Sequence, residues 1–310
     1  MANILVVGSI NMDVVTPITR MPAAGETLHA GDVDYLPGGK GANAAVAAAR
    51  LGGEVRLVGC VGDDPFGSNL QDHLRRERID VSRVRVAPTK TGIAVILLEK
   101  DSGQNSILVS PGANALVQAP QDDAWYAWGE VLMLQLECPL STAVRAAQLA
   151  RRNGVLVILD PAPACPLLPP ELLGEVDVLL PNETELATLA RMPAGSLDEI
   201  TAAAKSLQVS TGVPTIIVTL GPRGALIASD AGQFLAPPAP VVAVDTTAAG
   251  DTFAGALAVA LAEGLPIYDA VAFATNAGAL ACTAVGAQSA MPTRAAVLDR
   301  LEQLPRREID

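Results

Sequence analysis

Short runs of consecutive apolar residues recur along this chain, and stretches with helical periodicity separate them. A continuous apolar run predicts a strand that is covered on both faces. Strands that alternate with helices predict a doubly wound α/β fold, with a mainly parallel sheet flanked by helices. The predicted strands are Ile4–Val7, Val55–Val61, Leu132–Leu136, Val155–Leu159, Val176–Leu180 and Thr215–Thr219. The predicted helices include Asn43–Leu51, Leu140–Arg152, Glu183–Ala190 and Leu197–Ser210.

Two regions depart from this rhythm and alternate apolar with polar residues instead. They span residues 12–37 and 91–109, and the second has the pattern of a hairpin that turns at residues 101–104. Alternation with a period of two predicts antiparallel ribbons. Because both regions interrupt the first third of the chain, we expect them to form one small β-sheet. This sheet would be a discontinuous lid on a single domain that spans residues 1–310.

Small or polar residues follow nearly every predicted strand at its carboxyl end. A strand has to end somewhere, so one such residue by itself indicates little. Open parallel sheets, however, bind their ligands in the crevice beyond the carboxyl ends of the strands. The whole set therefore favours a polar ligand at this edge of the sheet. Its members are Gly8–Asn11, Gly62–Asp64, Glu137, Asp160, Asn182 and Thr219.

The chain of 310 residues has a net charge of −12, from 21 Lys and Arg against 33 Asp and Glu. This acidic balance argues against nucleic acid or an anionic membrane as a partner, because both repel a negatively charged protein. The apolar stretches are too short to cross a bilayer, and no leader pattern is present. We therefore expect a soluble protein of the cytoplasm.

The segment Asp245–Gly255 (DTTAAGDTFAG) predicts a tight turn of small residues that opens a helix. The free N–H groups of Ala248, Ala249 and Gly250, together with the helix dipole, would form a cradle for an anion such as a phosphoryl group. A carboxylate beside a phosphate needs a role, and Asp251 is placed to accept the proton of an attacking hydroxyl. The alternative is an ordinary helix N-terminus at which an acidic residue interacts favourably with the dipole.

A second glycine-rich segment, Gly38–Ala49, begins with the letters GGKGAN. It matches the pattern of a dinucleotide-binding turn, but Pro37 and a ribbon-like segment precede it instead of a buried strand. Lys40 is followed by Gly41 and not by Ser or Thr, which excludes a Walker A loop. What remains is a glycine turn that lets the backbone approach a small ligand. Asn43 in this turn either bonds hydroxyl groups or serves as a helix cap.

These two segments resemble the two signatures of the ribokinase (PfkB-type) family of sugar kinases. Other motifs of that family match in order and spacing over nearly the whole chain. The resemblance implies a ribokinase-like α/β fold with a small β-sheet lid, and an ATP-dependent kinase that acts on a sugar hydroxyl. The further matching motifs are Gly8–Asp13, Pro181–Glu185, Thr219–Gly224 and Gly286–Gln288.

The resemblance also implies which residues bind the sugar and which act in catalysis. The catalytic set is Asp251 as base with Ala248, Ala249 and Gly250 as anion hole. Lys40 either adds positive charge near the transferred phosphoryl group or is an ordinary solvated lysine. The residues expected to bind the sugar are Asn11, Asp13, Gly38, Gly39, Lys40, Asn43, Glu137 and Asp251.

For the nucleotide, the resemblance implies a second group of residues together with Mg²⁺. Glu185 would hold the Mg²⁺ ion through water. Thr275 stands where family members usually have His or Asn against the adenosine, and the neighbouring Asn276 is a substitute. The residues expected to bind ATP are Asn182, Thr219, Leu220, Gly221, Pro222, Arg223, Gly224, Gly250, Thr275 and Asn276.

Many members of the family bind a potassium ion beside the anion hole. The last ligand of that ion is commonly Ser, and Ala290 occupies its place in this chain. Because backbone carbonyls can still act as ligands, we expect activation by K⁺ that is weakened or relaxed. The matching residues are Asp245, Thr247, Ala281, Ala284, Gly286 and Ala290.

The activity that the resemblance implies is transfer of the γ-phosphoryl group of ATP to the 5-hydroxyl of D-ribose. Aromatic residues make up only 3% of the chain, and Tyr35 is the one aromatic residue in the predicted lid, which leaves little to stack on a nucleobase. The alternatives are a kinase for 2-deoxyribose, a ketohexose, a keto-deoxy sugar acid or a nucleoside, and a non-catalytic sugar sensor. Exposed lid edges also predict a homodimer, since unpaired strand edges need covering.

Overall fold

The computed structural model describes residues 2–99, 105–238 and 240–302, and a sheet of nine strands forms its centre. The strand order is β13-β12-β11-β10-β9-β8-β1-β4-β5, and all neighbours from β11 to β5 pair in parallel. The predicted doubly wound, mainly parallel sheet is therefore confirmed. The bounds are β1 Ala2–Val7, β4 Gly53–Gly62, β5 Asp80–Ala87, β8 Val131–Leu134, β9 Leu156–Leu159, β10 Val178–Leu179, β11 Thr215–Thr219, β12 Ala225–Ser229 and β13 Gly232–Ala236.

Each predicted apolar run lies on one of the parallel strands, within a few residues at its ends. The strands β5, β12 and β13 were not among the predictions. The strand β5 lies at one edge and exposes much of its length, while β12 and β13 pair antiparallel with their neighbours at the other edge. The exposed strands β5 and β13 lack the continuous apolar pattern of strands that are covered on both faces. The strand β12 is buried and apolar, and the prediction missed it.

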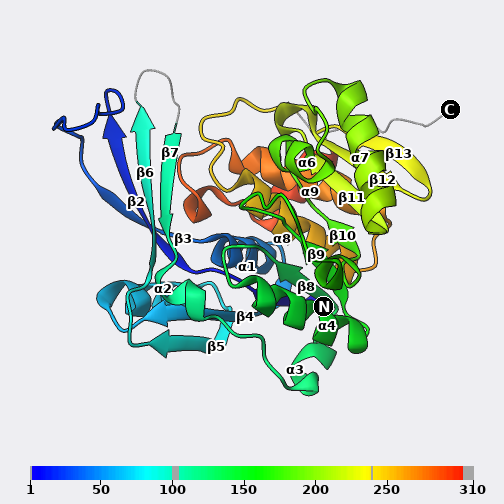
Figure 1. Cartoon of the computed structure of the whole chain (residues 1–310), viewed down its shortest axis with the longest axis horizontal. Coiled ribbons are helices and arrows are strands. Elements are labelled where there is room, and N and C mark those ends of the chain that lie inside the picture. Colours follow the sequence, from blue (N-terminus) through cyan, green and yellow to red (C-terminus); the bar gives the residue numbers. More distant parts are fainter. Residues whose placement is uncertain (1, 100–104, 239, 303–310) are drawn as a thin grey trace.

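Helices cover both faces of the main sheet, as the alternation along β1 requires (Figure 1). Ile4 and Val6 point into one hydrophobic cluster, and Leu5 and Val7 point into the other. The predicted helices are all present. The helices are α1 Lys40–Arg50, α2 Pro65–Arg76, α3 Asp123–Ala127, α4 Leu140–Arg152, α5 Pro170–Leu173, α6 Glu183–Ala190, α7 Leu197–Thr211, α8 Ala249–Ala262, α9 Ile267–Ala281 and α10 Arg294–Glu302, with short 3₁₀ turns η1 Gly112–Leu116, η2 Gly221–Arg223 and η3 Gln288–Ala290.

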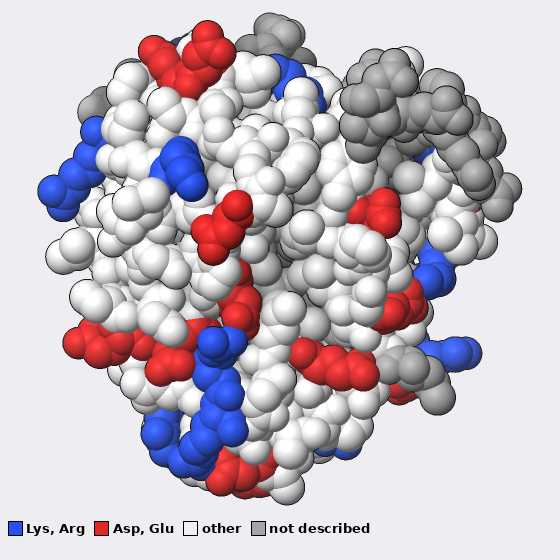
Figure 2. All heavy atoms as spheres, turned by 90° about the vertical axis from the view of Figure 1, so that its right-hand side faces the viewer, with Lys and Arg blue, Asp and Glu red and all other residues white. Residues whose placement is uncertain are grey.

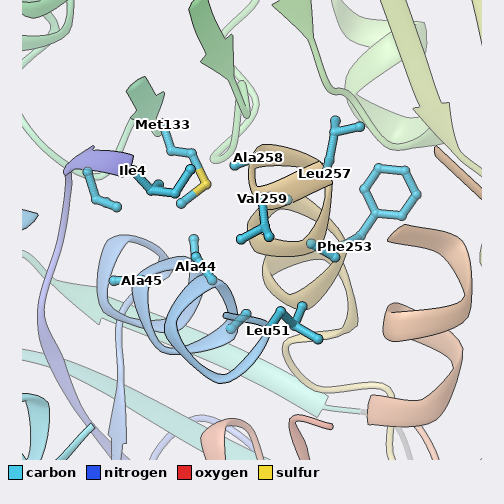
Figure 3. Close-up of a cluster of buried hydrophobic side chains, with 14 of the residues drawn as sticks. Ile4, Ala44, Ala45, Leu51, Met133, Phe253, Leu257, Ala258 and Val259 are labelled. Atoms are coloured by element: carbon cyan, nitrogen blue, oxygen red, sulfur yellow. The ribbon is translucent and has the colours of Figure 1, made fainter. Parts of the chain in front are cut away.

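The helices α1 and α8 pack side by side against the middle of the sheet (Figure 3). The helices touch at small residues, because a Cβ atom on Gly255 of α8 would lie 2.7 Å from both the Ala44 carbonyl oxygen and the Ala47 Cβ of α1. Alanine and glycine allow two helices to approach closely, because their side chains add little bulk between the backbones. This packing brings the first turns of α1 and α8 together at the carboxyl edge of the sheet.

A second sheet of four strands stands at one side of the main body (Figure 1). Its order is β3-β2-β6-β7, with β2 and β6 parallel and the outer pairs antiparallel. The two regions with alternating patterns therefore form one small sheet, as expected, although residues 19–33 contain no strand. The predicted hairpin turn at residues 101–104 lies outside the described residues. The bounds are β2 Asn11–Ile18, β3 Asp34–Gly38, β6 Gly92–Glu99 and β7 Asn105–Ser110.

The surface carries charges of both signs in small separate groups, as the face drawn in Figure 2 shows. Several of these groups are ion pairs, including Arg151 with Asp177 and Arg294 with Glu263. Within the described ranges, no helix combines the length and the apolar character that crossing a membrane requires.

Candidate active site

The polar residues that follow the strands gather at the carboxyl edge of the main sheet. Ser9 follows β1, Glu137 follows β8, and Asp160 follows β9. In the sheet, β1 lies between β4 and β8, so the strand order changes direction at β1. Such a switch point opens a crevice for ligands. Asp64, after β4, instead caps α2 and accepts hydrogen bonds from Thr91. The other predicted strand ends form one site.

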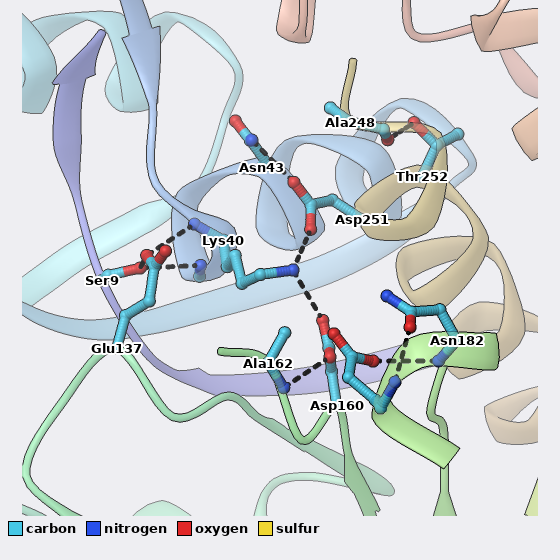
Figure 4. Close-up of polar contacts among 12 residues, drawn as sticks. Ser9, Lys40, Asn43, Glu137, Asp160, Ala162, Asn182, Ala248, Asp251 and Thr252 are labelled. Carbon is cyan, nitrogen blue, oxygen red and sulfur yellow. Dashed lines mark hydrogen bonds and ion pairs between the residues drawn. The ribbon is translucent and has the colours of Figure 1, made fainter. Parts of the chain in front are cut away.

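Glu137 organises the part of the site next to the small sheet (Figure 4). Its Oε2 accepts a hydrogen bond from the Ser9 hydroxyl and lies 3.4 Å from the backbone nitrogen of Lys40. The Nδ2 of Asn11 lies 3.5 Å from the same oxygen. Amide and carboxylate groups thus face one another at the end of β1, where they can bind a polyol.

Asn114, which the sequence analysis did not single out, fixes the orientation of Asn11. Its Nδ2 donates to Asn11 Oδ1 at 2.6 Å, and its Oδ1 accepts from the backbone nitrogen of Ile10 at 2.9 Å. The Asn11 amide therefore presents Nδ2 toward Glu137 and the site. Asn114 lies in η1, and no motif or spacing marks it in the sequence.

Asp13 is buried beside the glycine turn that precedes α1. A Cβ atom on Gly38 would lie 2.1 Å from an Asp13 carboxylate oxygen, so the missing side chain of Gly38 leaves the space that this carboxylate occupies. Burial raises the pKa of Asp13 to about 7, and the carboxylates of Glu137 and Asp251 add to that rise. Asp13 is therefore poised to gain or lose a proton near neutral pH.

Gly39 forms the turn itself, with φ of 92°, and α1 begins at Lys40 directly after it. Its missing side chain lets the turn lie against the backbone of Asn11 and Ser9, which an added Cβ would contact at 2.7 and 2.9 Å. Asn43 lies inside the helix and does not cap it, so the capping alternative for Asn43 is wrong. Its side chain points to α8 instead.

The turn Ala248–Gly250 opens α8, as the sequence predicts. Ala248 is the N-cap residue with φ of 57°, and its carbonyl accepts from the backbone and hydroxyl of Thr252 at 2.9 and 2.8 Å. The Ala249 N–H donates to the Thr246 carbonyl at 3.3 Å, so this member of the predicted anion hole already has a partner. The first N–H groups of a helix have no partner within it, so those of Gly250 and Asp251 remain available. A Cβ atom on Gly250 would meet nothing within 4 Å. The start of α8 is thus open to an anion.

Asp251 is buried in the first turn of α8 and contacts α1 through both carboxylate oxygens (Figure 4). The Nδ2 of Asn43 donates to Oδ2 at 2.7 Å. The Nζ of Lys40 lies 3.6 Å from Oδ1 of Asp251. The same Nζ lies 3.1 Å from Oδ2 of Asp160. Lys40 therefore bridges two carboxylates, and the alternative of an ordinary solvated lysine is wrong.

The Lys40 ammonium keeps its charge in this position. Burial alone lowers its pKa, but the neighbouring carboxylates of Asp160, Asp251 and Glu137 raise it above its usual value. Burial raises the pKa of the Asp160 carboxyl, and Lys40 opposes that rise. Asp160 also accepts from the backbone nitrogen of Ala162 at 3.0 Å. The arrangement places a fixed positive charge beside Asp251.

Asn182 and Glu185 form a capping box at the start of α6, next to this charged group. The Asn182 side chain accepts from the Glu185 nitrogen at 2.9 Å, and Glu185 Oε2 accepts from the Asn182 nitrogen at 2.9 Å. Burial raises the pKa of Glu185, and Asp160 raises it further. The other Glu185 oxygen is the kind of ligand that Mg²⁺ prefers and commonly shares with water and phosphate. The described residues bring no group of three metal-binding side chains together. Glu185 therefore fits a Mg²⁺ ion that is held mainly by water and phosphate.

The segment Thr219–Gly224 lies beside Asn182, because Thr219 forms a parallel bridge with it. The segment turns through η2 between Gly221 and Gly224, both with positive φ. Arg223 pairs with Glu183 of the neighbouring helix. The structure thus places the predicted ATP-binding segment next to Asn182, on the same edge of the sheet.

Thr275 and Asn276 are buried in the middle of α9. The Thr275 hydroxyl donates to the carbonyls of Val271 and Ala272 of its own helix, and Asn276 Nδ2 donates to the Ala272 carbonyl. Their contact with adenosine stays a prediction.

Asp245 links the two loops that were expected to hold potassium. Its Oδ1 accepts from the backbone and hydroxyl of Thr247 at 2.9 and 2.7 Å, and its Oδ2 accepts from the Gly286 nitrogen at 2.8 Å. Burial raises the pKa of Asp245, but these donors outweigh that effect and lower it. Ala281 ends α9, where carbonyl groups lack helical partners. The residues present fit a monovalent cation, although Ala290 supplies no side-chain oxygen.

His73 of α2 contacts a residue that is far away in the chain. It is half-buried, and its Nε2 lies 2.7 Å from Oε1 of Gln288. The two residues are 215 positions apart in the chain, and no local pattern connects them. The sequence marks Asp160 only as a polar residue at the end of a strand. The structure shows that its carboxylate forms an ion pair with Lys40.

A family model described as pfkB family carbohydrate kinase matches residues 1–294. The chain belongs to this family. The expected family and the expected ribokinase-like fold are both confirmed. As a pfkB carbohydrate kinase, it is an enzyme that transfers a phosphoryl group from ATP to a hydroxyl group of its carbohydrate substrate.

Curated relatives agree with this assignment over nearly the whole chain. The ribokinase of Haemophilus influenzae is 39% identical over 301 residues, which cover 96% of this chain and 97% of that protein. The ribokinase of Schizosaccharomyces pombe is 40% identical, with 94% and 96% covered. The deoxyribokinase of Salmonella typhi is 38% identical, also with 94% and 96% covered.

A solved structure is similar over the same length. The Arabidopsis thaliana ribokinase complexed with ribose and ATP superposes with a TM-score of 0.89 at 36% identity. The match covers 97% of this chain and 99% of that protein. The small sheet of this pfkB kinase is thus part of an architecture that a solved ribokinase shares.

Proposed function

We propose that this pfkB kinase is a ribokinase that transfers the γ-phosphoryl group of ATP to the 5-hydroxyl of D-ribose. The observation that supports this most directly is the position of Asp251, between the open N-terminus of α8 and the polar groups at the end of β1. The similarity to curated ribokinases and to a ribokinase bound to ribose and ATP supports the choice of sugar.

In the proposed complex, the pentose lies between the small sheet and α1. Asn11, Asp13, Glu137 and Asn43 bind its hydroxyl groups, and the backbone of the Gly38–Lys40 turn approaches the ring. All of these groups are buried or half-buried. A buried polar site discriminates strongly between sugars, since an unpaired group in it costs free energy. This set of groups orients one hydroxyl toward Asp251.

Asp251 accepts the proton of the 5-hydroxyl while the oxygen bonds to the γ-phosphorus. The bond between that phosphorus and the bridging oxygen to the β-phosphate breaks, and ADP leaves with both electrons of that bond. Phosphoryl transfer needs little covalent help from the protein, so position and charge supply most of the acceleration. The carboxylate contributes about 10²–10⁴-fold as a positioned base.

Negative charge on the phosphoryl oxygens is stabilised from two sides. The predicted anion hole Ala248–Gly250, in which Gly250 has its N–H available, and the dipole of α8 face it from one side, and the Lys40 ammonium lies on the other. Asn182, Thr219–Gly224 and Gly250 bind the nucleotide, with Thr275 and Asn276 near the adenosine. Mg²⁺, held through Glu185 and water, neutralises phosphate charge when bound.

Three further properties complete the proposal. The Asp245 and Gly286 loops would hold a potassium ion that activates the enzyme, and the activation would be weak because Ala290 lacks a hydroxyl. The small sheet acts as a lid that excludes water from the phosphoryl group. The exposed strand β7, with Leu108 at 66% exposure, supports a homodimer that covers this edge. We place the enzyme in the cytoplasm.

The substrate is tested by a coupled ADP-release assay with ATP, Mg²⁺ and a panel of D-ribose, 2-deoxyribose, D-fructose, a keto-deoxy sugar acid and adenosine. We expect the highest kcat/KM with D-ribose. The similarity to a deoxyribokinase makes 2-deoxyribose the main alternative, and a higher kcat/KM for it would overturn the proposed sugar. Tyr35 is the aromatic residue of the small sheet, and its ring centroid lies 5.6 Å from that of Phe66. Because this ring already packs on another one, it supports a bare sugar as substrate over a nucleoside.

A further inference from the structure

A chain of hydrogen bonds connects Asp251 to the surface of α2. Asn43 Nδ2 donates to Asp251 Oδ2 at 2.7 Å, and Gln288 Nε2 donates to Asn43 Oδ1 at 2.9 Å. His73 Nε2 lies 2.7 Å from Gln288 Oε1. Asn43, Gln288 and Asp251 are each at most 7% exposed, so water does not compete for these bonds.

The donor and the acceptor of each of these three hydrogen bonds follow from the chemistry of Asp251. Its ionised carboxylate can only accept, so Asn43 must present its NH₂ group, and the Asn43 oxygen then faces Gln288. Gln288 must therefore present its own NH₂ group to Asn43. Its oxygen is left facing His73, whose Nε2 must carry a hydrogen to donate. The chemistry of one carboxylate thus fixes two amide orientations and one histidine tautomer.

The Gln288 side chain is not needed to hold its own loop. Arg50 donates to the backbone carbonyl of Gln288 and to that of Met291 at 3.3 Å. Arg50 is itself held by a bidentate ion pair with Glu77, in which its Nε donates to Oε2 at 3.0 Å and its Nη2 donates to Oε1 at 2.6 Å. Because Arg50 anchors the backbone of η3, the Gln288 amide is available for another task.

We infer that Gln288 is a positioning residue for Asn43, and through it for Asp251, and that His73 locks the Gln288 amide in the required orientation. The inference rests on the proposed role of Asp251 as base. An asparagine amide can rotate by half a turn at little cost in shape. Gln288 prevents this rotation, which would turn the Asn43 oxygen onto the Asp251 carboxylate and push the base away from the sugar hydroxyl.

The test compares two substitutions of similar shape. Gln288→Met removes the donor, and Gln288→Glu replaces it with an acceptor that favours the wrong orientation of Asn43. We expect kcat to fall about 10-fold for Q288M and about 10²-fold for Q288E, the cost typical of a small displacement of a reacting group. KM for ATP should stay within about 2-fold. A kcat for Q288E within about 2-fold of the wild type would overturn the inference.

A variant cycle with Asn43→Ala separates positioning from a merely structural role. If Gln288 acts only through Asn43, Q288E should cost little further kcat in the N43A protein. An equal loss in both backgrounds would overturn the inference. The matched control is Gln208→Met, which removes another buried glutamine that bonds Pro214 and Asp230 away from the site. It should leave kcat unchanged.

His73 provides the rescue experiment. His73→Phe removes the donor to Gln288 and should lower kcat about 3–10-fold, whereas His73→Gln keeps an N–H group and should retain most activity. Equal activity of the two variants would contradict the locking role. All variants are assayed with whichever panel sugar the wild type phosphorylates fastest. A different best sugar therefore refutes the proposed substrate and leaves this test unchanged.

Discussion

The Nδ2 of Asn114 lies 2.6 Å from the Oδ1 of Asn11, although 103 residues separate them in the chain. This bond determines which end of the Asn11 amide faces the site. Asn114 also bonds both backbone groups of Ile10. A residue outside all the sequence motifs thus prepares the proposed sugar site.

Asn114→Ala should raise KM for ribose about 10-fold. This factor corresponds to the free energy of one hydrogen bond that holds a binding group in place. KM for ATP should not change, because the side-chain hydrogen bonds of Asn114 go to Ile10 and Asn11 at the proposed sugar site. Steady-state kinetics with each substrate varied in turn measures both values. A matched control is Asn153→Ala at the end of α4, which should change neither. Equal increases in both KM values would show a general loss of structure.

Asp13→Asn should stabilise the protein at neutral pH while it weakens sugar binding. The pKa of Asp13 is raised from 3.8 to about 7 by folding, so the folded protein holds a proton that the unfolded chain has lost. Stability therefore falls as pH rises between these values, and the full cost is present above pH 7. The asparagine does not ionise and avoids a cost on the order of 2–4 kcal/mol.

Thermal unfolding across pH tests this expectation. The melting temperature of D13N should exceed that of the wild type by an amount that is small near pH 4 and grows to pH 8. A difference that stays constant with pH would show that Asp13 does not titrate in this range.

Lys40→Met should lower kcat about 10²-fold, since it removes a fixed positive charge beside the transferred phosphoryl group. It also leaves Asp160 and Asp251 without their shared partner. The double variant Lys40→Met with Asp160→Asn should regain folding stability but not kcat. Recovery of kcat in the double variant would mean that Lys40 only neutralises Asp160. Lys205→Met on α7 is the matched control.

Ala290→Ser should strengthen activation by potassium. The hydroxyl would add one oxygen ligand to the loop that Asp245 holds through Gly286. Activity is measured at constant ionic strength in K⁺, Na⁺ and choline chloride. We expect the wild type to be activated modestly by K⁺, and the variant to reach half-activation at a lower K⁺ concentration. Equal rates in all three salts for both proteins would contradict the proposed cation site.

The sequence predicted the parallel strands β1, β4, β8, β9, β10 and β11, because a strand that is covered on both faces must be continuously apolar. The helix limits of α4 and α6 match the prediction residue for residue. The strand β5 was not predicted, because its exposed position at the edge of the sheet allows Arg83 and Arg85, which interrupt the apolar pattern. The strand β13 is exposed over most of its length and lacks the apolar pattern, whereas β12 is a buried apolar run that the prediction missed.

For the site, the sequence identified those residues that lie in ordered motifs, such as Asn43 and Asp251. It missed partners that only the tertiary fold brings near, such as Asn114 and the contact of His73 with Gln288. A single asparagine or histidine in a sequence has no period or spacing to reveal its contact. The bridging position of Lys40 likewise depends on where β9 ends, since Asp160 follows that strand.

The turnover of Asp251→Asn with saturating ribose and MgATP tests the central claim most directly. The amide keeps the shape of the carboxylate and the contact with Asn43, but it cannot accept the proton. We predict that kcat falls about 10²–10⁴-fold, while calorimetric titration shows ribose and ATP binding with affinities close to those of the wild type. A kcat near that of the wild type, in a variant with an unchanged melting temperature, would contradict the assignment of Asp251 as the base.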